Sequence, residues 1–251
     1  FYVEYPARFL RRRLSLHRFS FIVASLLLIA VQCLAQSSSY QREFDTGDKL
    51  SVSIKNRNGR VTVIASEESA NKARLEASSA GIPVGESDVA AKADGGKLDI
   101  DVRQRREQDR IDIVVRIPVR SKVEIESGAG AVSVVGNLES AVVKTDTGTI
   151  HADVPLDALK YDFVWEASRP RYMSDIELKE VKEKAGGWFR LSGKLGDKET
   201  PKEERVALNF HTQRGVVLLN VDPAMVPSDL RERPLTEAAR AIVRSGDSEL
   251  V

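Results

Sequence analysis

The sequence predicts an all-β protein of stacked strand-turn-strand repeats, either right-handed and β-solenoid-like or arranged as two sheets. A twelve-residue pattern with a glycine at one constant position occurs four times. Apolar and polar residues alternate on both sides of that glycine, which is typical of two half-buried strands joined by a tight bend. The same alternation recurs outside the repeats, over residues 97–102 and 111–119.

The four repeats are aligned on their turn glycines, which are Gly59, Gly130, Gly148 and Gly215. Five and seven residues before each glycine, and two and four after it, every copy carries an apolar residue or alanine. We therefore expect these positions to form one continuous core. The residues four positions before the glycine should face outward: Lys55, Glu126, Lys144 and His211.

The first 35 residues have the composition of a signal peptide. Arg11–Arg13 precede an uncharged, mainly apolar stretch over 19–31, and small residues lead up to Ala35. A helix of that length rises about 20 Å, less than the roughly 30 Å of a bilayer core. We expect cleavage after Ala35; an uncleaved anchor, or a lipoprotein acylated on Cys33, remains an alternative.

Export and charge limit the classes of partner. The only cysteine lies in the predicted leader, so the mature chain would depend on its core without disulfides. The leader holds five of the 38 Lys and Arg residues and one of the 37 Asp and Glu residues, which leaves a net charge of −3. This balance gives no electrostatic case for nucleic acid, and membrane contact would come only through an uncleaved leader.

The expected organisation is a signal peptide over 1–35 and a β-repeat domain over 36–225. An insertion over 156–205 interrupts the repeats. Residues 226–251 form a linker and a short C-terminal helix, where a helical pattern follows Pro234 and meets a stop at Gly246. A second cap signal precedes Val251, which predicts that a longer protein continues beyond it.

Two further elements are expected between the first and second repeats. Residues 97–102 and 111–119 should pair as an antiparallel hairpin, with the charged run between them as its tip. A short helix is expected over 87–93. The aspartates of the hairpin should face solvent: Asp99, Asp101, Asp109 and Asp112. The tip arginines (103, 105, 106 and 110) should form a solvated turn or contact an acidic partner.

No catalytic, metal or cofactor site is predicted. Two Asp-Thr-Gly triplets, at 45–47 and 146–148, match the aspartic protease tripeptide. Asp146, however, occupies a repeat position that holds Arg57 and Gln213 in other copies, which favours a turn. His151 and His211 lack a second ligand at metal-binding spacing, so we expect exposed strand residues and no cofactor.

The insertion holds the best candidate for partner recognition. Its aromatic residues Phe163, Trp165, Trp188 and Phe189 are expected mainly to cap the core. Aromatic and arginine side chains also dominate binding hot spots. The candidate partner-binding residues are therefore Trp165, Arg169, Arg171 and Trp188.

The segment from Ile111 to Val154 resembles the bacterial "putative adhesin" family DUF4097. The resemblance rests on an apolar strand that reaches Pro118, followed by successive units of the form S/T-x-x-G-x-V-x-V. It is fainter over 48–66 and 206–221. It implies an exported β-repeat domain without defined catalytic residues. The layout also resembles the leading part of large exported proteins with a von Willebrand factor A-type domain downstream.

We therefore expect a non-enzymatic, exported scaffold that presents a surface to protein or glycan partners in the periplasm, at the cell surface or outside the cell. A carbohydrate-active enzyme of the polysaccharide lyase type is the first alternative, because β-solenoids also support that chemistry. A structural spacer for a downstream domain is the second.

Overall fold

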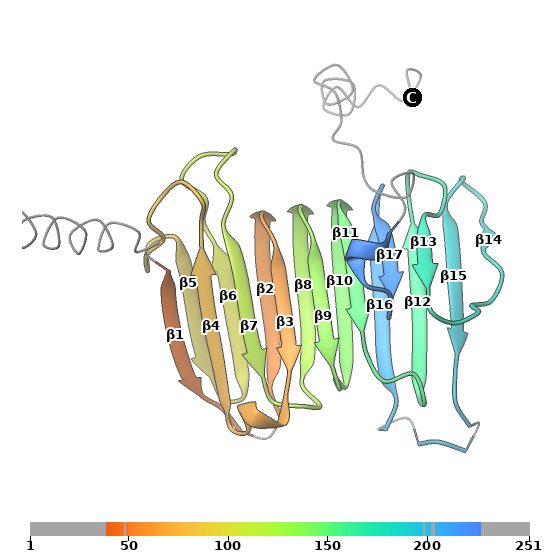
Figure 1. Ribbon diagram of the computed structural model, residues 1–251, viewed down its shortest axis with the longest axis horizontal. Coiled ribbons are helices and arrows are strands. Elements are labelled where there is room, and N and C mark those ends of the chain that lie inside the picture. Colours follow the sequence, from red (N-terminus) through yellow and green to blue (C-terminus); the bar gives the residue numbers. More distant parts are fainter. Residues whose placement is uncertain (1–38, 48, 198, 202–203, 227–251) are drawn as a thin grey trace, which may run out of the picture. The chain divides into compact units, whose positions relative to one another are not determined.

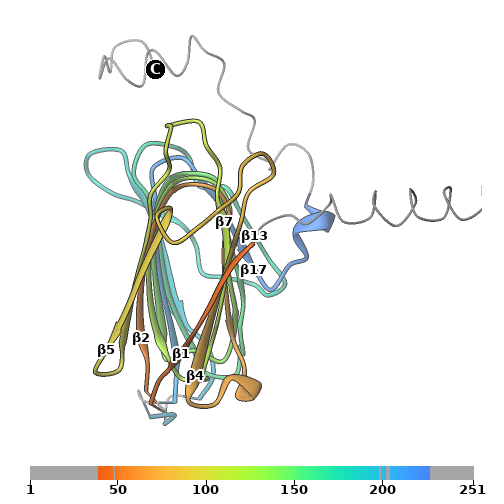
Figure 2. The ribbon, with the colours of Figure 1, turned by 90° about the vertical axis from the view of Figure 1, so that its left-hand side faces the viewer.

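The computed structural model describes residues 39–47, 49–197, 199–201 and 204–226, which form two large β-sheets. The sheets face each other as two layers with the apolar core between them (Figures 1 and 2). The all-β prediction is confirmed in its two-sheet form. The predicted leader over 1–35 and the predicted C-terminal helix lie outside the described residues.

Sheet A has eight strands. Their spatial order is β1 (Tyr40–Asp45), β4 (Lys72–Ser78), β7 (Asp112–Ile117), β3 (Val61–Ala65), β9 (Val132–Gly136), β11 (Thr149–Asp153), β17 (Val216–Leu219) and β13 (Tyr172–Ser174). Two short 3-10 helices, η2 (Glu67–Ser69) and η3 (Pro223–Met225), follow β3 and β17 along the chain.

Sheet B has nine strands. Their spatial order is β14 (Lys182–Glu183), β15 (Phe189–Lys194), β12 (Leu159–Trp165), β16 (Val206–Thr212), β10 (Ser140–Thr147), β8 (Lys122–Ala129), β2 (Ser51–Asn58), β6 (Lys97–Val102) and β5 (Val89–Asp94).

Each predicted repeat is an arch that crosses from sheet B to sheet A. The first strand (β2, β8, β10 or β16) lies in sheet B, and the second (β3, β9, β11 or β17) lies in sheet A. Both strands pair in parallel with the equivalent strands of neighbouring units rather than with each other. Each unit is therefore two strands joined by a tight bend, as expected, but it is an arch between sheets rather than a hairpin within one. The arches lie together at one end of the sheets, which we call the arch end (Figure 2).

Two more units share this architecture. β6 and β7 lie in different sheets, so the hairpin predicted over 97–102 and 111–119 is wrong. The charged residues between them instead span the roughly 10 Å between packed sheets. In the 156–205 insertion, β12 pairs in parallel with β16 and β13 with β17. The insertion thus supplies a sixth unit, and the last repeat lies between it and the β10–β11 unit.

Antiparallel strands complete both ends of the stack. β5 pairs with β6 in sheet B, and β4 and β1 extend sheet A beyond β7. Because β5 covers residues 89–94, the helix predicted over 87–93 is wrong. At the opposite end, β15 pairs with β12 and β14 pairs with β15.

The core contains every apolar position that the repeat alignment predicts. These positions are at most 2 % exposed in all four copies. Near the β12 end the side chains are aromatic: the rings of Phe163 and Phe210 stack with centroids 5.0 Å apart. Tyr161 and Trp165 extend this cluster and are also buried. The alternation therefore identified the buried face of each strand correctly.

The turn glycines allow the arches to approach one another closely. Gly59, Gly130 and Gly148 have φ values of 137°, 143° and 114°, a region that disfavours any side chain. A Cβ at Gly130 would also overlap the carbonyl oxygen of Gly59, and one at Gly148 would overlap that of Gly130. Gly215 lies outside this φ region, but a Cβ there would lie 2.7 Å from the Gly148 carbonyl oxygen.

Candidate functional site

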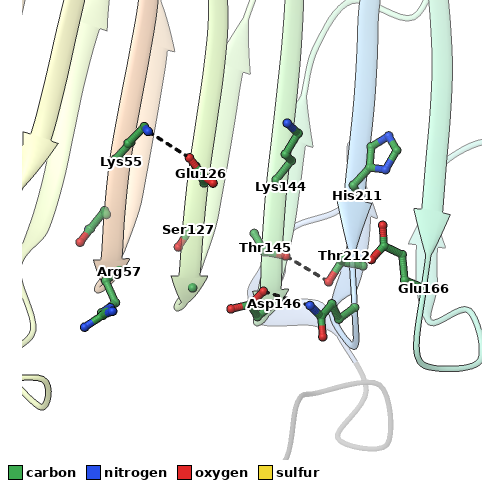
Figure 3. A pocket seen from close by; sticks show the side chains of 13 residues that line it. Lys55, Arg57, Glu126, Ser127, Lys144, Thr145, Asp146, Glu166, His211 and Thr212 are labelled. Carbon is green, nitrogen blue, oxygen red and sulfur yellow. Dashed lines mark hydrogen bonds and ion pairs between the residues drawn. The ribbon is translucent and has the colours of Figure 1, made fainter. Parts of the chain in front are cut away.

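A shallow trough of about 500 Å³ crosses sheet B at the arch end (Figure 3). Its lining comes from β2, β8, β10 and β16 and from Glu166, which follows β12. Because these strands are parallel and in register, equivalent repeat positions line the trough as straight rows.

The first row contains the outward residues of the repeats. Lys55 lies opposite Glu126, which lies opposite Lys144, and Lys144 lies opposite His211. Lys55 Nζ is 3.5 Å from a Glu126 carboxylate oxygen, and both side chains remain more than 60 % exposed. Lys144 Nζ is 4.0 Å from a carboxylate oxygen of Glu124, which precedes Glu126 by two residues in β8. The row therefore presents alternating charges to solvent, on the face that the sequence predicted.

The second row is polar but buried. It is formed by the residues three positions before each turn glycine: Asn56, Ser127, Thr145 and Thr212. The Thr145 hydroxyl donates to Thr212 Oγ1 at 3.0 Å, and the Gly215 N–H donates to the same oxygen at 2.8 Å. Asn56 donates to the Ile111 carbonyl oxygen at 2.9 Å. These bonds connect neighbouring arches beneath the trough.

The third row lies at the arches themselves. Gln213 donates to the Asp146 carboxylate at 3.4 Å, while Arg57 makes no ion pair within the described part of the chain. Asp146 lies in the middle of sheet B, whereas Asp45 ends the edge strand β1 of sheet A. The two Asp-Thr-Gly triplets therefore do not form a carboxylate dyad, and both aspartates lie near the ends of strands rather than in turns.

A second hollow of about 480 Å³ adjoins the trough and shares Lys55 and Arg57 with it. Its outer wall is the loop between β6 and β7. Arg105 donates to Asp88 through Nε at 2.7 Å and through Nη2 at 2.8 Å. This pair, together with the Gly85 N–H, holds the pKa of the buried Asp88 carboxyl below its ordinary value.

Two other contacts order the same loop. Arg106 donates through Nε to Asp109 at 3.1 Å, and Gln104 donates to Asn56 Oδ1 at 2.7 Å. Asp109 is buried, so its predicted solvent exposure is wrong: its carboxylate also accepts the Arg106 backbone N–H. The other three aspartates of the predicted hairpin keep partly exposed side chains. The charged run is therefore an ordered wall.

The predicted partner-binding residues lie apart from the trough lining. Trp165 is fully buried and donates to the Gly215 carbonyl oxygen at 3.2 Å, so it offers no surface. Trp188 is half-buried beside β15. Arg171 donates to the Arg214 carbonyl oxygen, and Arg169 is exposed on the loop after Glu166. The burial of Trp165 argues against its direct contact with a partner, and the partner-binding role of Arg169, Arg171 and Trp188 stays a prediction.

The two histidines lie on different sheets, and both are half-buried. His211 belongs to the outward row of the trough. His151 is on the outer face of sheet A, with Nδ1 2.9 Å from Ser133 Oγ. Burial lowers the pKa of His151, and the charges of Asp153 and Asp222 oppose that shift. Within the described residues, no three His, Cys, Asp or Glu side chains are placed to hold a metal ion.

No protein-family model matches the chain, and no curated protein matches it. Among solved structures it is similar to a putative cell adhesion protein from Clostridium sporogenes, at 9 % identity and a TM-score of 0.41, over 72 % of this chain and 98 % of that one.

Two other solved structures show weaker similarity. A putative adhesin from Bacteroides fragilis matches at 6 % identity and a TM-score of 0.21, over 73 % of this chain and 97 % of that one. A putative lipid binding protein from Parabacteroides distasonis matches at 8 % identity and a TM-score of 0.23, over 74 % and 98 %. No helix in the described residues is long and apolar enough to cross a membrane.

Proposed function

We propose that this chain is a non-enzymatic, exported scaffold of the adhesin-like type that binds a protein or glycan partner along the trough of sheet B. The observation that carries this proposal is the outward row of Lys55, Glu126, Lys144 and His211, set in register on four parallel strands. Because the core and the second row hold these strands, little backbone conformational entropy would be lost on binding.

The exposure of the row favours recognition over catalysis. Lys55, Glu126 and Lys144 have side chains that are 64 %, 62 % and 58 % exposed. Electrostatic catalysis is most effective in sites that exclude water, where charges interact strongly. Exposed charges that alternate in sign instead suit reversible contacts with a polar partner. Arg169, on the loop after Glu166, would extend such a contact beyond the trough.

The test is a binding screen with the full chain against a glycan array and a panel of cell-envelope and extracellular proteins. Saturable binding of at least one partner is expected. Glu126→Lys should change the affinity severalfold, because the variant places three lysines side by side in the row: it weakens the binding of a neutral or cationic partner and strengthens that of an anionic one. Lys160→Glu is the control: Lys160 is exposed on sheet B, four residues before Val164, which lies opposite His211. Equal binding by wild type and Glu126→Lys would contradict the proposal.

The same preparation separates the two alternatives. A polysaccharide lyase would show sustained turnover of acidic polysaccharides, and that result would replace the binding role. A spacer would bind no member of either panel while remaining fully folded. The first outcome would replace recognition by catalysis, and the second would remove the trough as a binding site.

A further inference from the structure

We propose that the second hollow binds the anionic groups, carboxylate or sulfate, of an acidic polysaccharide whose chain continues along the trough. We call this hollow the arginine hollow; its cations are Lys55, Arg57, Arg103, Arg105 and Arg106. The inference rests on the proposed function and names the partner class for the same surface.

The cations of the arginine hollow outnumber the acids of its lining. Five basic side chains line it, against Asp101 and Glu107. Arg103 pairs with Asp101, and Arg105 and Arg106 pair with the buried Asp88 and Asp109.

Arg57 makes no ion pair within the described residues. Lys55 Nζ lies 3.5 Å from a Glu126 carboxylate oxygen, and both side chains are largely exposed. Lys55 and Arg57 also line the trough, so a single ligand could contact both hollows.

Buried carboxylates hold two of the arginines in place. The side chains of Asp88 and Asp109 are 3 % and 6 % exposed, whereas those of Arg105 and Arg106 are 55 % and 64 % exposed. The carboxylates therefore sit beneath the guanidinium groups. A guanidinium has about five N–H donors, and the Asp88 contact uses the Nε and Nη2 groups of Arg105, which leaves donors for a ligand. Such pre-organised forks suit planar or tetrahedral anions.

The lining of the trough favours a sugar chain over a uniformly charged strand. Beyond Arg57 the trough presents the acceptors Glu126, Asp146 and Glu166 together with the Gln213 amide. Carboxylates at this spacing would repel a phosphate backbone but accept hydrogen bonds from sugar hydroxyls. An acidic polysaccharide has both hydroxyls and spaced anionic groups, so it matches both hollows.

The test titrates the full chain with polygalacturonate, which carries carboxylates, and with dextran sulfate, which carries sulfates. Neutral dextran and polyglutamate, an anionic polymer without sugar, are the reference polymers. At least one anionic polysaccharide should bind about tenfold or more tightly than dextran, with weakening at high salt. Arg57→Gln should reduce that affinity about tenfold, because it removes a charge-assisted contact. Lys160→Gln removes a similar charge elsewhere on sheet B and should leave the affinity unchanged.

Three results would overturn the inference: equal binding of dextran, an Arg57→Gln variant with wild-type affinity, or polyglutamate binding as tightly as the polysaccharides. The Arg57 side chain makes no hydrogen bond or ion pair with the described residues, so Arg57→Gln should stay folded, and matched melting curves check this. If a partner from the screen depends on Glu126 but not on Arg57, this inference fails and the proposed function stands. If no member of the screen and none of the polymers binds, both the inference and the proposed function fail.

Discussion

The connections from sheet B to sheet A are of two kinds, short arches and long loops, and they differ in how closely they pack on their neighbours. Short arches join β2 to β3, β8 to β9 and β10 to β11, with only Gly59–Arg60, Gly130–Ala131 and Gly148 between the strands. The longest connections run from 103 to 111, between β6 and β7, and from 166 to 171, between β12 and β13. All of them lie at the arch end, where Figure 1 shows the loops of the outer units rising beyond the central arches.

This difference shows which connections have room for large and charged side chains. The short arches are stacked so closely that an added Cβ would meet the backbone of the neighbouring arch. The long connection at 103–111 instead carries Arg105 and Arg106, which pair with the buried Asp88 and Asp109. The central arches therefore hold the register, while the loop at 103–111 and the outward row of sheet B carry the exposed charged side chains that are proposed to contact a partner.

The largest expected effect is at the short arches. Gly130→Ala should lower the free energy of unfolding by about 3 kcal/mol, because positive φ strain adds to overlap with the Gly59 carbonyl oxygen. Urea unfolding at neutral pH measures it.

Gly187→Ala is the matched control for Gly130→Ala. Gly187 has a φ of 78°, but nothing lies within 4 Å of the Cβ that alanine would add. It should therefore lose only about 1 kcal/mol, from backbone strain alone. Equal losses at the two glycines would mean that close approach of the arches is unimportant.

A smaller effect is expected at Asp88, whose carboxylate pairs with Arg105 of the connection at 103–111. Asp88→Asn should lower the unfolding free energy by about 1 to 2 kcal/mol, since it removes charge-assisted hydrogen bonds to a half-exposed arginine. The folded pKa of Asp88 is below its ordinary 3.8, so this stabilisation is present above that pH and is lost as the pH falls through the folded value. The difference between wild type and variant should therefore shrink in acid.

Asp101→Asn is the control for the Asp88 experiment. Asp101 pairs with Arg103 at 3.0 Å, but its side chain is 51 % exposed. The loss should stay below about 0.5 kcal/mol. A difference between wild type and Asp88→Asn that keeps its size in acid would argue against the assigned role of the Asp88 carboxylate.

The buried second row allows a comparison between two short arches. Thr212→Ala should cost about 1 kcal/mol, because Thr212 Oγ1 accepts from both Gly215 and Thr145. Ser127 Oγ is buried without a hydrogen-bond partner among the described residues. Ser127→Ala should therefore be neutral or stabilising by up to about 1 kcal/mol. Thermal melting of both variants checks the signs, and a destabilising Ser127→Ala would reveal a missing partner.

The smallest effect is expected for His151, on the outer face of sheet A. Burial lowers the folded pKa of His151, so protonation favours the unfolded chain and stability should rise with pH from the lowered value up to the ordinary 6.5. Asp153 and Asp222 oppose this shift, so the change should be a few tenths of a kcal/mol. Melting temperatures at about pH 5 and about pH 8 measure it. His151→Gln should flatten the difference, and an unchanged slope would assign it to another group.

Much of the core and part of the site followed from local pattern. The alternation around Gly59, Gly130, Gly148 and Gly215 identified the buried positions and the outward row that lines the trough. The second row was visible as a constant polar position, but a polar residue in an apolar strand does not reveal its partner. The arginine hollow was harder, because Asp88 lies 17 residues before Arg105 and no spacing rule links them.

Strand identity, turn position and inward face are local properties of this chain, because a period of two and a glycine tolerant of positive φ act within a few residues. Whether a strand pairs with the next strand in the chain or with a strand of another unit depends on how far the backbone rotates at the turn. Both arrangements show the same alternation of apolar and polar residues. The burial of apolar side chains between the two sheets, which joins residues far apart in the sequence, favours arches. It also put the last repeat inside the stack and Trp165 in the core, and it brought Arg57 beside the arginines of the loop at 103–111.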